Sequence, residues 1–155
     1  MKRFLLAILA ITFLMGGVAW GAGTCVQQSV VSYPSSTSPL QKALTVTCTA
    51  DASTANFPTM AINATNTAAL KGWYLYKVQT NPGATAPTDN WDFTITDSDG
   101  IDVLQGAGAN RHTTTSQRVS PTYYEPLLGT WTLAITDSSN LVNSAVIAFT
   151  LFFVR

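Results

Sequence analysis

The residues best suited to chemistry are aspartates that gather around one short turn. Asp97, Asp99 and Asp102 lie close together in the chain, with Gly100 between them. Calcium takes several hard oxygen ligands at such turns, so these three carboxylates are the ligands we predict if an ion binds. A complete EF-hand loop is missing, because position 108 is glycine where its bidentate glutamate would stand. The competing prediction is an ordinary hairpin turn with no cofactor, since aspartate and glycine also favour turns.

A second group of candidates is aromatic. Tyr74 and Tyr76 alternate along a predicted strand, so they share one face while Leu75 lies on the other; Tyr123 and Tyr124 are adjacent further along. Only one face of a strand can pack on a given core, so some of these rings are expected at the surface. There they would stack on sugar rings or pack against a protein partner. The alternative is that they belong to the core or to the rim of a sheet.

Catalytic residues are sparse. His112 is the only histidine, so a Ser-His-Asp arrangement would need it together with Ser116 or Ser120, and no nucleophile-elbow motif accompanies them. Glu125 is the only glutamate, which leaves little for a pair of carboxylates across a glycosidase cleft. These observations predict a protein that is not an enzyme.

Cys25 and Cys48 are the only cysteines. In an exported chain, two cysteines are expected to form a disulfide. Cys48 shares one face of an alternating segment with Leu44 and Val46, so its side chain is predicted to point to the core. A metal role is not favoured, because two cysteines and one histidine cannot supply four zinc ligands.

The elements that position these groups are strands. Alternation with period two runs through most of the chain, and helical periodicity is nearly absent. Turn residues separate the alternating segments, notably at 97–100 and 137–140, and longer loops are expected at 33–39, 81–90 and 105–116. The last segment is apolar on both faces, as expected for a central strand. Strands are predicted at 26–32, 44–49, 57–62, 73–80, 91–96, 101–104, 117–119, 129–136 and 145–154.

With these nine segments as candidates, an all-β fold of about eight strands is predicted, a two-sheet antiparallel β-sandwich of jelly-roll or immunoglobulin-like type. A single domain is expected over residues 22–155.

An export signal precedes the expected domain. Lys2 and Arg3 are followed by an apolar run over residues 4–15 and then by small residues, which is the pattern of a signal peptide over 1–21. An uncleaved anchor and a lipoprotein modified at Cys25 are the alternatives, although Thr24 stands where a lipobox has glycine or alanine.

Cleavage would remove two of the eight Lys and Arg residues and none of the eight Asp and Glu residues, so the mature charge would be 6 − 8 = −2. No basic patch remains for nucleic acid. No membrane span is expected after cleavage, because the apolar segment 145–154 is too short.

Two segments resemble known families. Residues 90–111, NWDFTITDSDGIDVLQGAGANR, resemble a hairpin and loop of small, poorly characterised bacteriophage structural proteins. The strands at 129–135 and 145–154 fit the ending of those proteins, so the resemblance covers about residues 70–155. Separately, residues 129–137, GTWTLAITD, are similar to a strand of the P domain that accompanies subtilisin-like convertases, a jelly roll without catalytic activity. The phage-type resemblance implies a structural or assembly role.

The expected function is therefore that of a secreted structural or assembly subunit, at the cell surface, in the periplasm or in an extracellular polymer. Its expected partner is another copy of the chain or another extracellular protein. The alternative is an extracellular carbohydrate-binding module, with calcium as an optional ion and a polysaccharide as the ligand. A pilus-like subunit is less favoured, since only about three residues would precede Cys25 after cleavage and no donor strand is available.

Overall fold

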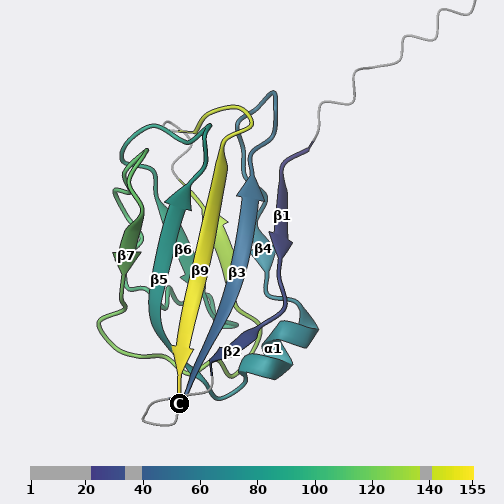
Figure 1. Ribbon diagram of the computed structural model, residues 1–155, viewed down its shortest axis with the longest axis vertical. Coiled ribbons are helices and arrows are strands. Elements are labelled where there is room, and N and C mark those ends of the chain that lie inside the picture. The colour runs from purple at the N-terminus through teal and green to yellow at the C-terminus, as the bar shows by residue number, and fades with distance from the viewer. Residues whose placement is uncertain (1–21, 34–39, 137–140) are drawn as a thin grey trace, which may run out of the picture.

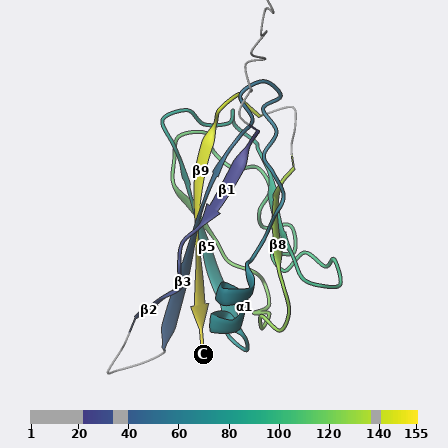
Figure 2. The ribbon, with the colours of Figure 1, turned by 90° about the vertical axis from the view of Figure 1, so that its right-hand side faces the viewer.

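Alternating apolar segments of the chain form strands, and the strands form two layers. The computed structural model describes residues 22–33, 40–136 and 141–155. The predicted signal peptide at 1–21, most of the predicted loop at 33–39 and the predicted turn at 137–140 lie outside the described residues. Two antiparallel sheets pack face to face, as Figure 2 shows edge-on. The predicted all-β sandwich is thereby confirmed.

The larger sheet, sheet A, has the order β1-β3-β9-β5-β7, and β2 also pairs with β3. β9 lies between β3 and β5 along its length (Figure 1). Its apolar residues on both faces therefore belong to a central strand, as predicted. The strands of sheet A are β1 (Thr24–Gln27), β2 (Val31–Tyr33), β3 (Gln41–Thr49), β5 (Tyr74–Pro82), β7 (Gln117–Val119) and β9 (Val146–Val154).

The smaller sheet, sheet B, has the order β4-β8-β6. Its strands are β4 (Met60–Ala61), β6 (Phe93–Thr96) and β8 (Thr132–Ile135). The alternating apolar side chains of this layer, including Phe93, Ile95 and Trp131, are all buried. Phe93 meets Phe149 of sheet A with ring centroids 5.1 Å apart, so an aromatic contact joins the two layers.

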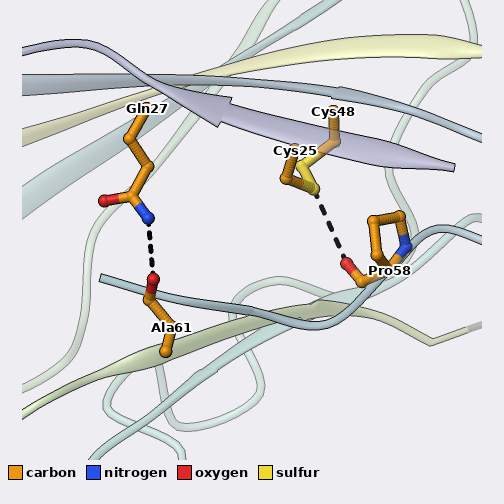
Figure 3. Close-up of a disulfide and its surroundings, with 5 residues drawn as sticks. All are labelled: Cys25, Gln27, Cys48, Pro58 and Ala61. Carbon is orange, nitrogen blue, oxygen red and sulfur yellow. Dashed lines mark hydrogen bonds between the residues drawn. A yellow bond between two sulfur atoms is a disulfide. The ribbon is translucent and has the colours of Figure 1, made fainter. Parts of the chain in front are cut away.

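The predicted disulfide is present and ties the edge strand β1 to β3. Cys25 and Cys48 are directly opposed in the antiparallel register, with Cα atoms 4.0 Å apart. Cys48 is fully buried, as its place in the alternating pattern predicted. The Sγ atom of Cys25 lies 3.6 Å from the carbonyl oxygen of Pro58, shown in Figure 3. A disulfide sulfur carries no proton, so we treat this as a packing contact between β1 and the segment before β4.

Two short elements differ from the predictions. The segment 26–32, predicted as one strand, forms the end of β1 and the start of β2 with a break between them. The prediction of a return strand at 101–104 was wrong. Only an isolated bridge joins Thr96 and Asp102, and the chain then forms successive turns. The physical reason is Asp102, whose carboxylate accepts hydrogen bonds from the backbone N–H groups of Leu104 and Gly106 and holds the chain in a turn.

One helix was not predicted. α1 (Ala64–Leu70) begins after Asn63, whose side chain accepts a hydrogen bond from the backbone N–H of Asn66. It ends before Gly72, which has a φ of +75°. Seven residues are too few for helical periodicity to stand out, although the cap and the glycine were visible signals. No helix among the described residues is long and apolar enough to cross a membrane.

Candidate functional site

Strand β5 presents Tyr74 and Tyr76 together on the outer face of sheet A; the sequence predicted that they share a face and left open which face packs on the core. Tyr74 pairs with Val154 of β9, and the register then shifts between Leu75 and Lys77. A bulge of this kind adds an extra residue to one strand and redirects its side chain. Leu75 is fully buried, whereas Tyr74 and Tyr76 are 42% and 37% exposed. The alternation along β5 therefore places both tyrosines on the outer face of sheet A and Leu75 on the core side.

The segment before β8 brings the other two tyrosines to the same place. The backbone N–H of Leu75 donates to the carbonyl of Glu125 at 3.1 Å, and Tyr74 forms an isolated bridge with Pro126. These bonds hold the segment beside the start of β5, so Tyr124 meets Tyr76 edge-on with ring centroids 6.1 Å apart. Tyr123 and Tyr124 are 71% and 53% exposed. All four predicted tyrosines thus lie on one surface.

An open cavity of about 630 Å³ lies among these rings. We call it the tyrosine groove; its lining is Tyr74, Thr122, Tyr123, Tyr124, Val154 and Arg155, and Tyr76 packs against its Tyr124 wall. Sequence reasoning missed Thr122, Val154 and Arg155, because their part in the groove depends on strand pairing and not on a local pattern.

The outer face of sheet A continues from the groove along β9. Phe152 and Val154 are half-buried on this face, and the ammonium group of Lys77 lies 4.5 Å from the centroid of the Phe152 ring. Such cation–π contacts hold a lysine over apolar surface while its charge stays near water. In Figure 1 no described element crosses in front of β3, β9 and β5. This face is therefore a continuous, partly apolar surface with a cationic side chain upon it.

The acidic turn uses its carboxylates locally. Asp97 Oδ1 accepts hydrogen bonds from the backbone N–H groups of Asp99 and Ile101, each at 2.9 Å. Asp102 accepts three more, from Ile95, Leu104 and Gly106. Within the described ranges, no group of three or more His, Cys, Asp or Glu side chains is placed to hold an ion. The turn predicted at 97–100 is present, with Gly100 at a φ of +81°; calcium binding at Asp97, Asp99 and Asp102 stays a prediction.

His112 is engaged by its own loop. Its Nδ1 atom accepts hydrogen bonds from the backbone N–H groups of Thr114 and Thr115, and it lies 3.8 Å from a carboxylate oxygen of Asp89. The hydroxyl of Ser116 donates instead to the side-chain oxygen of Asn81 at 2.7 Å. The Ser116 hydroxyl is therefore directed at Asn81, and Nδ1, the nitrogen that faces the aspartate in a Ser-His-Asp arrangement, accepts backbone hydrogen bonds.

Two ionisable groups outside the groove have shifted pKa values. Hydrogen bonds from the Ser53 hydroxyl and from the backbone N–H groups of Thr54 and Ser53 lower the pKa of Asp51 to about 2. Partial burial lowers the pKa of Arg111, and the nearby charge of Asp92 opposes that shift. Neither group contributes to the groove lining, whose one charged side chain is Arg155.

Comparison with known proteins adds little to this description. No protein-family model matches the sequence, and no curated protein matches it at a significant level. One solved structure, that of the arabinose-bound MgGH51 α-L-arabinofuranosidase, is similar over 89% of this chain and 24% of its own, with 15% identity and a TM-score of 0.33. The chain spans about a quarter of that protein's length, and a likeness this distant carries no argument about function.

Proposed function

We propose that this chain is an exported, non-catalytic assembly protein whose copies associate through the tyrosine groove. The observation that carries the proposal is the meeting of four exposed tyrosines from two distant segments around one open cavity. Tyrosine offers a large apolar ring with few rotatable bonds and a hydroxyl for hydrogen bonding, and it is enriched at protein interfaces. Soluble monomeric proteins seldom expose such an aromatic cluster unless it forms an interaction site.

The distribution of charge favours a second copy as the partner. Lys77, Arg118 and Arg155 belong to sheet A or follow its central strand. The loops on either side of β6, a strand of the other layer, carry five aspartates and one cation, Arg111, which lies near Asp92; the aspartates are Asp89, Asp92, Asp97, Asp99 and Asp102. Opposite charges on opposite layers favour contact between the sheet A face of one copy and the sheet B side of the next. A contact between two different surfaces can repeat without closing, which produces a filament or a ring.

Location outside the cytoplasm is part of the proposal. The Cys25–Cys48 disulfide is compatible with an oxidising compartment, and the predicted signal peptide supports export. The bacteriophage-type resemblance supports an assembly role. Virion subunits assemble in the cytosol, so an exported relative would use the fold at the surface or in an extracellular polymer.

The experiment is sedimentation velocity across a concentration series, with negative-stain images of the most concentrated sample. We expect oligomers or filaments from the natural chain. Replacement of Tyr123 and Tyr124 by alanine should weaken association at least thirtyfold, since interface hot spots contribute about 2 kcal/mol or more. Val26→Ala is the matched control, because Val26 is an exposed apolar residue on β1, at the opposite edge of sheet A from β7.

Salt supplies a second measurement. If opposite layers attract, raising the ionic strength from about 0.05 M to about 0.5 M should weaken association by shortening the Debye length. A chain that stays monomeric at every concentration would contradict the proposal. If the tyrosine variant and the natural chain associate equally strongly, the tyrosine groove is not the interface between copies.

The carbohydrate hypothesis for the same tyrosines has less support. Exposed rings can stack on sugars, but the groove adds only Thr122 and Arg155 to the tyrosine hydroxyls as polar side-chain partners. Retention on an insoluble polysaccharide that is lost in Tyr74→Ala or Tyr76→Ala would favour it over self-association.

A further inference from the structure

A second, chemically different pocket lies where β1 and the loop after it face α1. It has a volume of about 220 Å³ and is lined by Gln27, Gln28, Ser29, Asn63, Thr65 and Asn66. All six side chains are polar and none is charged. We call it the amide pocket. Its lining contrasts with the apolar tyrosine groove, so the two sites suit different ligands.

A buried amide network holds this pocket in shape. Asn66 is only 3% exposed, and its Nδ2 atom donates to the carbonyl of Gln28 at 2.9 Å and to Oε1 of Gln27 at 3.3 Å. The same Gln27 oxygen accepts from the backbone N–H of Asn63 at 3.1 Å. Because its amide is buried and hydrogen-bonded, Asn66 is held in one orientation before any ligand arrives.

Gln27 also connects the pocket to the opposite layer. Its Nε2 atom donates to the carbonyl of Ala61 in β4 at 2.7 Å, as Figure 3 shows. Cys25, two residues earlier on the same strand, holds β1 to β3 through the disulfide. The part of β1 that lines the pocket is therefore held at two points, by the disulfide at Cys25 and by the hydrogen bond from the Gln27 side chain.

We propose that the amide pocket binds one uncharged sugar residue, free or as a unit of a neutral polysaccharide. Side-chain amides and hydroxyls both donate and accept hydrogen bonds, which matches the hydroxyl groups of a sugar ring. A lining without charge offers no ion pair to an acidic or basic ligand. The volume of about 220 Å³ gives room for a ligand the size of a single sugar ring.

The test is saturation-transfer NMR on the full chain with D-glucose, D-galactose, D-mannose and N-acetyl-D-glucosamine, each followed by titration. A ligand of roughly twelve non-hydrogen atoms, at the efficiency of ordinary ligands, binds with a Kd of about 1 mM. We expect at least one of the four to bind in this range, and D-glucuronate to bind more weakly because the pocket has no cation to meet it.

Paired variants locate the site. Ser29 and Thr65 are exposed, so replacing both by alanine removes two hydroxyl groups with little effect on folding. That change should raise the Kd about 25-fold, at about fivefold for each hydrogen bond. Ser29→Arg, which crowds the pocket, should abolish binding. Thr122→Ala and Tyr123→Ala, in the tyrosine groove, should leave the Kd unchanged.

Three results would overturn the proposal. The first is no saturation transfer from any of the four sugars at about 100 mM, a hundredfold above the expected Kd. The second is binding that survives Ser29→Arg in a variant whose thermal unfolding matches that of the natural chain. The third is binding lost in Tyr123→Ala but kept in the Ser29 and Thr65 variants, which would assign the sugar to the tyrosine groove. None of these results bears on self-association, so the two proposals can fail separately.

Discussion

Replacement of Gly108 by alanine should damage the core although Gly108 lies in a loop. A Cβ atom at this position would stand 2.0 Å from the carbonyl oxygen of Phe93 and 3.3 Å from its ring. Ordinary carbon–oxygen contacts are about 3.3 Å or longer, so the two backbones must separate by more than about 1 Å. The hydrogen bond from the Phe93 N–H to the Gly108 carbonyl, now 3.1 Å, would lengthen with them.

The expected loss of stability follows from these contacts. Loss of the hydrogen bond costs about 1 kcal/mol, and displacement of the buried Phe93 ring from Phe149 costs about 1–3 kcal/mol more. The free energy of unfolding should therefore fall by about 2–4 kcal/mol. For a domain of this size, that lowers the melting temperature by about 8–16 °C.

Gly106→Ala is the matched control for this experiment. Gly106 has a φ of +82°, but no heavy atom lies within 4 Å of a Cβ built upon it. The variant should lose only about 1 kcal/mol, which is the cost of the left-handed conformation. Thermal and urea unfolding, followed by circular dichroism, measure both variants. If Gly108→Ala is no less stable than Gly106→Ala, the close approach of this loop to β6 is not as described.

The remaining predictions concern other parts of the fold. Reduction of the disulfide, whose cysteines are 23 residues apart, should lower the free energy of unfolding by about 3 kcal/mol, and equal urea midpoints for the oxidised and reduced chain would argue against this. The folded pKa of Asp51, about 2, lies below its ordinary 3.8, so its contribution to stability is present above pH 3.8 and is lost as the pH falls through about 2. Asp51→Asn should therefore be less stable than the natural chain near neutral pH, and the difference should shrink between about pH 4 and pH 2; a pH-independent difference would contradict the assignment. Phe149→Ala should cost about 3–5 kcal/mol because its ring is fully buried, whereas Thr150→Ala, on the outer face of the same strand, should cost under about 1 kcal/mol in the same unfolding assay.

The alternation of apolar and polar residues predicted many of the strands, because strand formation depends largely on residues that are neighbours in the chain. In β5, the alternation separated Tyr74 and Tyr76 from Leu75 before any pairing was known. It failed at residues 101–104, where Val103 and Leu104 are consecutive and both buried. There, the side chain of Asp102 competes with a strand by accepting hydrogen bonds from nearby backbone groups.

From the sequence alone it followed that Tyr74 and Tyr76 share one face of a strand, that Cys25 and Cys48 form the disulfide and that the last strand is central. Each of these depends on the alternation of a single segment or on the presence of only two cysteines. The contact of Tyr123 and Tyr124 with Tyr74 and Tyr76, and that of Asn66 with Gln27, could be seen only in the folded chain. Those contacts depend on which distant segments pair and in what register, and register is set by the packing of the whole core. For that reason, the four tyrosines could be predicted one by one as surface candidates, whereas the tyrosine groove and the amide pocket could not.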